Sequence, residues 1–74
     1  MEETNRTKFL MLDILAKRRG GIAKLTSEEK IIYLQTGISE GFIPVQEAYE
    51  IAKKFNINDN YILKELFSGL DKVK

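Results

Sequence analysis

Basic and amide side chains at two places in the chain have the chemistry to bind a nucleic acid. At the first, Lys17-Arg18-Arg19 is followed by Lys24, and such ammonium and guanidinium groups hold phosphates. The second is the segment from Asn58 to Lys64, where amides can read base edges and a lysine can contact guanine or a phosphate. The candidate nucleic-acid-binding residues are therefore Arg18, Arg19, Lys24, Asn58, Asn60 and Lys64.

The distribution of charge favours the first place over the second. The formal net charge of the 74-residue chain is only +1, less than a strongly basic nucleic-acid binder usually shows. Residues 6–24 nevertheless carry six cations against Asp13 alone, whereas residues 44–70 carry more acids than cations. The basic run also has a structural explanation, because cations in the last turn of a helix are stabilised by the helix dipole. If the chain binds DNA, its phosphate contacts must come largely from residues 17–24.

Residues suited to catalysis are scarce. The chain has no cysteine and no histidine, which excludes disulfides, thiol and imidazole chemistry and the usual zinc sites. The segment Asn58-Asp59-Asn60 lacks the glycine and the closing glutamate of a calcium loop. We therefore expect a protein that is not an enzyme and has no catalytic residues, no metal and no cofactor.

Two helices must position the basic run. We expect the first over residues 7–19, ended by Gly20-Gly21 because glycine adopts the left-handed conformation at little cost. The second begins at a capping box, in which Thr26 and Glu29 satisfy each other's backbone amides. We expect it to end near residue 35 or 36, with Gly37 as its stop.

Two further helices must position the amide-rich segment. We expect the third to begin with Pro44 at its first position and to end at Asn56, which tolerates positive φ. The fourth is expected to begin with Asn58 as its N-cap and to reach residue 68 or 69. Because no segment alternates like a strand, we expect one compact all-α, four-helix domain over residues 1–74, with residues 1–6 frayed.

The segment from residue 51 to residue 66 resembles the helix-turn-helix superfamily. Ile51, Phe55 and Ile62 stand at inward positions, Ala52 is the small residue at the helix crossing, and Ile57 is the apolar turn residue. Two positions depart from the pattern. Asn56 replaces the usual glycine, and Glu65 stands where an inward apolar residue is usual. The resemblance covers 16 of the 74 residues, and it implies that the last helix enters a DNA groove.

Apolar residues exceed what one packing face needs on the first and last helices. Those on the first spread nearly all the way round, and those on the last occupy two adjacent stripes. Either the helices cross so that both faces are covered internally, or the surplus forms an interface with another subunit. The candidate interface residues are Phe9, Met11, Leu12, Leu63 and Phe67.

Two functions remain open. The first is a small cytoplasmic, helix-turn-helix-type DNA-binding regulator that acts as a homodimer on duplex DNA. The second is a non-catalytic protein-interaction module, an adaptor or inhibitor that docks through the apolar faces of the first and last helices. We expect no membrane partner, because the apolar run Phe9-Leu10-Met11-Leu12 is interrupted by Asp13. Exposure of Leu63 and Phe67 on the monomer would favour the second function.

Overall fold

The computed structural model describes residues 4–71, and these form four α-helices and one short 3₁₀ helix. In chain order the elements are α1 (Asn5–Arg19), η1 (Ile22–Lys24), α2 (Ser27–Ser39), α3 (Val45–Lys54) and α4 (Tyr61–Asp71). No strand occurs in this part of the chain, so the predicted all-α, four-helix fold is confirmed.

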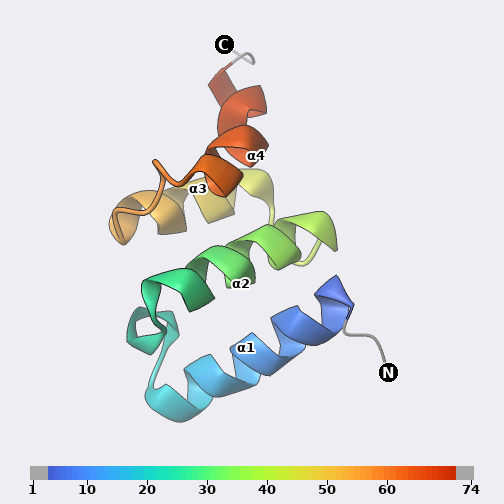
Figure 1. Ribbon diagram of the computed structural model, residues 1–74, viewed down its shortest axis with the longest axis vertical. Helices are drawn as coiled ribbons and strands as arrows, with labels where there is room; N and C mark the ends of the chain where they lie inside the picture. Colours follow the sequence, from blue (N-terminus) through green and yellow to red (C-terminus); the bar gives the residue numbers. More distant parts are fainter. Residues whose placement is uncertain (1–3, 72–74) are drawn as a thin grey trace.

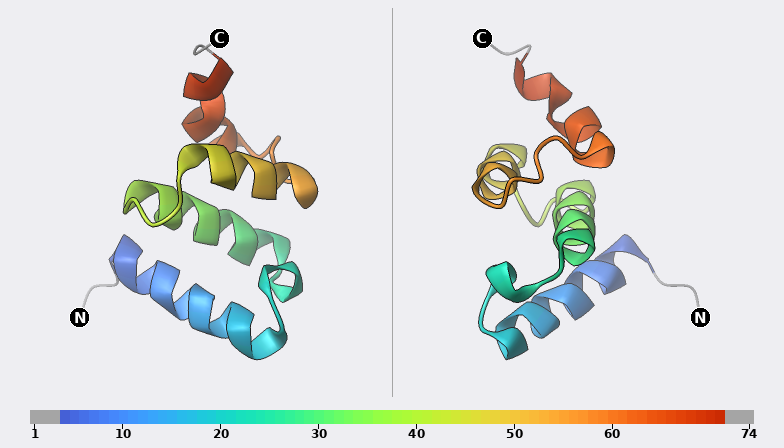
Figure 2. Two further views of the ribbon diagram at one scale, coloured as in Figure 1. Left: turned by 180° about the vertical axis from the view of Figure 1, so that it is seen from behind. Right: turned by 60° about the vertical axis from the view of Figure 1, so that its left-hand side comes forward.

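Helix α2 is the centre of the molecule. Helix α1 packs along one side of it, and α3 and α4 pack against it from the other side (Figure 1). Helices α1, α2 and α3 run back and forth, so that the end of α1, the start of α2 and the end of α3 share one end of the molecule (Figure 2). The fold therefore has two halves on either side of α2, and the α2–α3 connection also reaches α1, where the Phe42 ring lies 4.9 Å from the Phe9 ring.

Helix α1 begins two residues earlier than predicted. Thr4 is its N-cap, and the Thr4 side-chain hydroxyl accepts a hydrogen bond of 3.1 Å from the Thr7 backbone amide. Residues 5 and 6 are therefore helical rather than frayed, while residues 1–3 lie outside the described part of the chain. The predicted end is confirmed, because Gly20 takes a φ of 100° and its amide bonds to carbonyls in the last turn.

Gly37 does not stop α2, and that prediction is wrong. The helix begins at the predicted Thr26 capping box but continues through Gly37 to Ser39. A Cβ at position 37 would lie 2.5 Å from Ile43 Cδ1 and 2.9 Å from Phe9 Cε1. Glycine is therefore required there for close packing, and the chain reverses later, at Gly41 with a φ of 77°.

The connection between α3 and α4 is longer than predicted. Pro44 precedes α3 as its N-cap, and Asn56 takes the expected positive φ, 62°. Helix α4, however, begins at Tyr61 rather than just after Asn58. Its N-terminal amides are capped by Asn60, whose Oδ1 accepts hydrogen bonds from Ile62 (2.9 Å) and Leu63 (3.4 Å). Asn60 therefore has the capping role that we assigned to Asn58.

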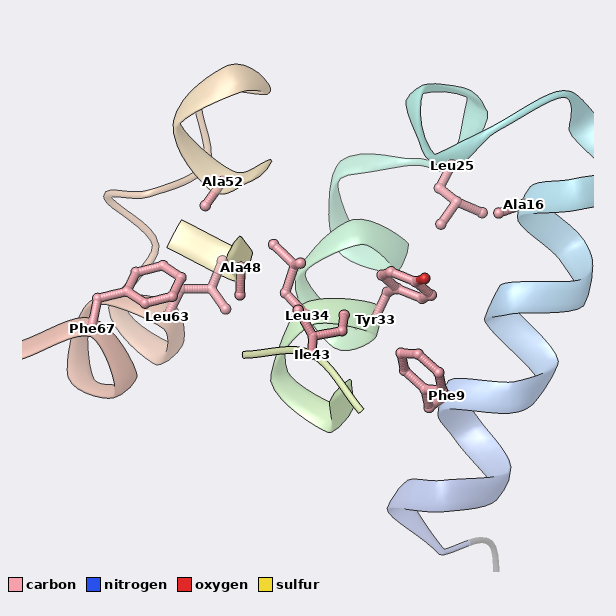
Figure 3. Close-up of a cluster of buried hydrophobic side chains, with 10 residues drawn as sticks. All are labelled: Phe9, Ala16, Leu25, Tyr33, Leu34, Ile43, Ala48, Ala52, Leu63 and Phe67. Carbon is pink, nitrogen blue, oxygen red and sulfur yellow. The ribbon is translucent and has the colours of Figure 1, made fainter. Parts of the chain in front are cut away.

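The buried residues form one cluster that extends to both sides of α2 (Figure 3). Between α1 and α2, the Phe9 ring stacks on the Tyr33 ring at a centroid distance of 4.7 Å. On the other side of α2, Leu34 and Leu63 are both fully buried. There the Phe67 ring meets Tyr49 edge-on at 5.3 Å. The other buried hydrophobic residues are Ala16, Leu25, Ile43, Ala48 and Ala52.

Candidate nucleic-acid interface

The end of α1, η1, the start of α2 and the end of α3 lie along the same side of the molecule (Figures 1 and 2), and each of these segments carries cationic residues. We call this the basic end. It comprises Lys17, Arg18, Arg19, Lys24, Lys30, Lys53 and Lys54. Six of these side chains belong to exposed residues, and Lys30 is half-buried. The structure thus places the predicted Arg18, Arg19 and Lys24 together, and it adds three lysines that the sequence reasoning did not select.

Local structure explains the path of the chain at the basic end. After α1, Gly20 and Gly21 both take positive φ, 100° and 132°, which turns the chain sharply into η1. Leu25 then anchors this connection by packing beside Ala16 in the core (Figure 3). The connection is short, so Arg19 at the end of α1 remains within reach of Glu29 in the first turn of α2.

Two of the seven cations are neutralised within the chain. The Arg19 guanidinium donates a hydrogen bond of 2.9 Å to Glu29 Oε1, and the same carboxylate accepts 2.9 Å from the Thr26 amide. The Thr26 amide is the main cause of a lowered pKa for Glu29, and Arg19 lowers this pKa further. Lys17 forms an ion pair of 3.1 Å with Asp13. Among the described residues, the remaining five cations of the basic end form no salt bridge.

Aromatic rings hold three of these lysines in place. The Lys30 ammonium lies 4.6 Å from the centre of the Phe55 ring, which joins the first turn of α2 to the end of α3. Lys54 lies over the same ring at 5.7 Å, and Lys53 lies over Tyr49 at 5.4 Å. Such cation–π contacts orient the lysine side chains and leave their ammonium groups charged. Phe55 therefore serves as a half-buried platform for two cations of the basic end.

The second predicted group of residues lies elsewhere. Asn58, Asn60 and Lys64 lie in the α3–α4 connection and the first turn of α4, across α2 from α1 (Figure 1). Asn58 is half-buried, and Asn60 Oδ1 is engaged in capping α4. Lys64 is exposed, but the exposed residue beside it is the acidic Glu65. The start of α4 therefore offers less positive charge than the basic end.

The helix-turn-helix resemblance stays a prediction. Six residues, 55–60, separate α3 from α4, whereas the motif usually has a turn of about three or four. Leu63, in the first turn of α4, has an exposed fraction of 0%, so its side chain is not available to contact a base. Among residues 61–69 of α4, the exposed ones are Tyr61, Lys64, Glu65, Ser68 and Gly69.

Three of the five predicted interface residues are wrong. Phe9, Leu63 and Phe67 are buried in the core, because Phe9 faces α2 and the Leu63–Phe67 stripe of α4 faces inward. Helix α4 therefore has no exposed apolar face at Leu63 and Phe67. On α1, Leu12 is half-buried against the core and only Met11 is well exposed, at 57%. The structure instead exposes two other apolar side chains of α1, Leu10 and Ile14.

A signal for the missed lysines was present in the sequence. Lys53 and Lys54 occupy the last turn of α3, as Lys17, Arg18 and Arg19 occupy the last turn of α1. Short connections make α1, α2 and α3 alternate in direction, which brings both basic last turns to the same end. Lys30 had no comparable signal, since its position over Phe55 depends on the packing of α3 against α2.

Comparisons with known proteins do not identify a family for this chain. No family model matches it, and neither the curated proteins nor the solved structures gave a significant match. Within residues 4–71, no helix combines the length and apolar character needed to cross a membrane.

Proposed function

We propose that this protein is a small DNA-binding regulator that binds the phosphate backbone of duplex DNA through its basic end. The observation that carries the proposal is the convergence of seven cations from four segments on one end of the molecule. In the segments that form this end, residues 17–30 and 53–55, the only acids are Glu28 and Glu29. Glu29 is engaged by Thr26 and Arg19, so the exposed Glu28 is the one acid of these segments left to oppose a phosphate, against five cations without a salt bridge.

The five cations without a salt bridge are the proposed phosphate contacts: Arg18, Lys24, Lys30, Lys53 and Lys54. Base reading by α4 has weaker support, because Asn60 caps the helix and Lys64 lies beside Glu65. Phosphate contacts position a protein on DNA without selecting a sequence. Binding by one basic end is therefore expected to be weak and salt-sensitive, and a homodimer would strengthen it through avidity.

The proposal is tested by titrating a fluorescently labelled random-sequence duplex with the protein while the salt concentration is varied. We expect micromolar affinity that falls linearly on a log–log plot of binding against salt, with a slope of about −0.9 for each phosphate contacted. The double variant Lys53→Gln/Lys54→Gln should weaken binding and make the slope shallower by about 2. Binding that is absent at low salt, or that does not respond to salt, contradicts the proposal.

The double variant Arg6→Gln/Lys8→Gln is the matched control. It removes the same number of charges from the first turns of α1, at the opposite end of the molecule from α1's basic last turn. Both residues are exposed, so the fold should be unaffected. If this control reduces the slope as much as the lysine pair does, binding depends on overall charge and not on the basic end.

A further inference from the structure

Helix α1 has a second apolar face that no other described element covers. Its inner face, with Phe9 and Ala16, is buried against the core. On the outer side, Leu10, Met11 and Ile14 are 45%, 57% and 55% exposed. Their spacing of three and four residues places them on one side of the helix. We call Leu10, Met11, Ile14, Leu15 and Arg18 the outer face of α1.

The outer face contains an open depression whose size and apolar lining suit a single side chain, and we call it the socket. Four residues of α1 line it, Met11, Ile14, Leu15 and Arg18, and its volume is about 220 Å³. Sites that hold drug-sized molecules are usually larger, about 300–1,000 Å³. The socket suits one apolar side chain of a partner, and the Arg18 guanidinium at its edge suits a carboxylate beside that side chain.

The charges around the outer face indicate that its partner is negatively charged. Helix α1 carries Arg6 and Lys8 before the apolar side chains and Lys17, Arg18 and Arg19 after them; of these, Arg6, Lys8 and Arg18 form no salt bridge among the described residues. Its only acid is Asp13, which forms an ion pair with Lys17 and accepts a hydrogen bond of 3.4 Å from the Tyr33 hydroxyl. The outer face is therefore apolar in its middle and positive at both ends, which complements an acidic ligand.

The same charges disfavour a second copy of this chain as the occupant. If two α1 helices packed antiparallel through Met11 and Ile14, Lys17 of one copy would lie close to Lys8 of the other. In a parallel arrangement each cation would lie beside its equivalent. Like charges placed across an interface reduce affinity, so self-association through this face is opposed by electrostatics.

We propose that the outer face of α1 binds an acidic amphipathic helix of another protein. In this mode of recognition, apolar side chains spaced three and four residues apart dock on a complementary apolar surface. One of them enters the socket between Met11 and Leu15, and an adjacent carboxylate pairs with Arg18. Helix α1, at about 22 Å, is long enough to align with roughly four turns of the partner helix. Arg18 is also one of the five proposed phosphate contacts, so the partner helix and DNA share this residue, whereas Met11 and Ile14 belong to the outer face alone.

The test uses a synthetic helical peptide of about 16 residues, with leucines along one face and glutamates on the others. A matched peptide carries lysine in place of every glutamate. The glutamate peptide should bind the full-length protein at least about tenfold more tightly than the lysine peptide, because only the former complements α1. Amide NMR shifts on binding should be largest for residues 10–18.

Variants of the protein locate the binding site. Met11→Gln and Ile14→Gln should each weaken binding of the glutamate peptide several-fold, because each replaces an exposed apolar side chain by a polar one. Glutamine has a helix propensity similar to that of methionine and isoleucine, so α1 itself should be preserved. Tyr61→Gln is the matched control: it removes an apolar side chain that is 78% exposed on α4 and should leave peptide binding unchanged. Thermal unfolding confirms that each variant is folded.

Several outcomes would overturn the proposal. Equal binding of the two peptides, or peptide shifts outside α1, would show that this face does not select an acidic helix. Light scattering that detects a dimer of the protein alone, lost in Ile14→Gln, would identify a second copy as the occupant. Displacement of the peptide by anionic lipid vesicles would assign the face to a membrane surface. DNA binding should survive Met11→Gln and Ile14→Gln, so the two proposals fail separately.

Discussion

Helices α1 and α4 have a similar surplus of apolar residues in the sequence but different surroundings in the fold. Helix α4 packs against both α2 and α3, and its Leu63 and Phe67 are buried between them. Helix α1 packs mainly against α2 and the short η1, which cover its inner side, so Leu10, Met11 and Ile14 remain on the surface. The placement of neighbouring elements around each helix, and not its composition, decides which surplus is available to a partner.

The two halves should differ most in how far the free energy of unfolding falls when a large side chain is shortened. Leu63→Ala should lower the free energy of unfolding by about 2–5 kcal/mol, because it opens a cavity at a fully buried position. Ile14→Ala should change it by no more than about 0.5 kcal/mol, since Ile14 is 55% exposed. Urea unfolding followed by circular dichroism measures both. Equal losses from the two variants would show that Ile14 is covered.

The next largest effect concerns the contact between α2 and the α1 half. Gly37→Ala should cost about 1–3 kcal/mol, because the new Cβ would overlap Ile43 and Phe9. Gly69→Ala, in α4, is the matched control, since a Cβ there meets no atom within 4 Å. The control should stabilise the protein by about 0.5–1 kcal/mol through helix propensity alone. If the packing at Gly37 is as described, thermal unfolding should show a lower melting temperature for Gly37→Ala and a higher one for Gly69→Ala than for the unmodified protein.

A smaller effect is expected at the start of α2, the helix on which both halves depend. Thr26→Ala removes the hydroxyl that accepts a 3.1 Å hydrogen bond from the Glu29 amide. Loss of such a cap costs about 1 kcal/mol. Because α2 contacts both halves, the variant should lower the midpoint of a single unfolding transition. Two separate transitions would show instead that the α1 half and the α3–α4 half unfold independently.

The smallest effect is a dependence of stability on pH that comes from Glu29. The folded state lowers the pKa of Glu29 below its usual 4.5, mainly through the hydrogen bond from the Thr26 amide. Its contribution is therefore present above pH 4.5 and is lost as the pH falls through the lowered pKa. Glu29→Gln keeps a hydrogen-bond acceptor at this position of the capping box but should flatten the loss of stability below pH 4.5.

Glu28→Gln is the control for this measurement. Glu28 lies in the same turn, is exposed, and makes no salt bridge or side-chain hydrogen bond within the described part of the chain. Urea unfolding at a series of pH values should therefore give a steeper acid decline for Glu28→Gln than for Glu29→Gln. Identical declines would rule out Glu29 as the source.

The sequence by itself determined the features that depend on neighbouring residues. The number and order of the helices followed from their start and stop signals, and three of these are confirmed: Gly20, Thr26 and Asn56. Each acts through backbone groups within a few residues, so the local sequence contains all the required information. The clustering of Arg18, Arg19 and Lys24 followed for the same reason.

Only the tertiary structure decided the features that depend on packing between distant segments. The sequence alone predicts that Gly37 ends α2, whereas in the structure Gly37 lies inside the helix and packs closely against Phe9 and Ile43. The two stripes of α4 differ by one residue step, so only contact with α2 and α3 selects Leu63 and Phe67 for the core. Lys30 joins the basic end because the fold places Phe55 beneath its ammonium group. These choices depend on which surfaces exclude water together, and a single helix does not contain that information.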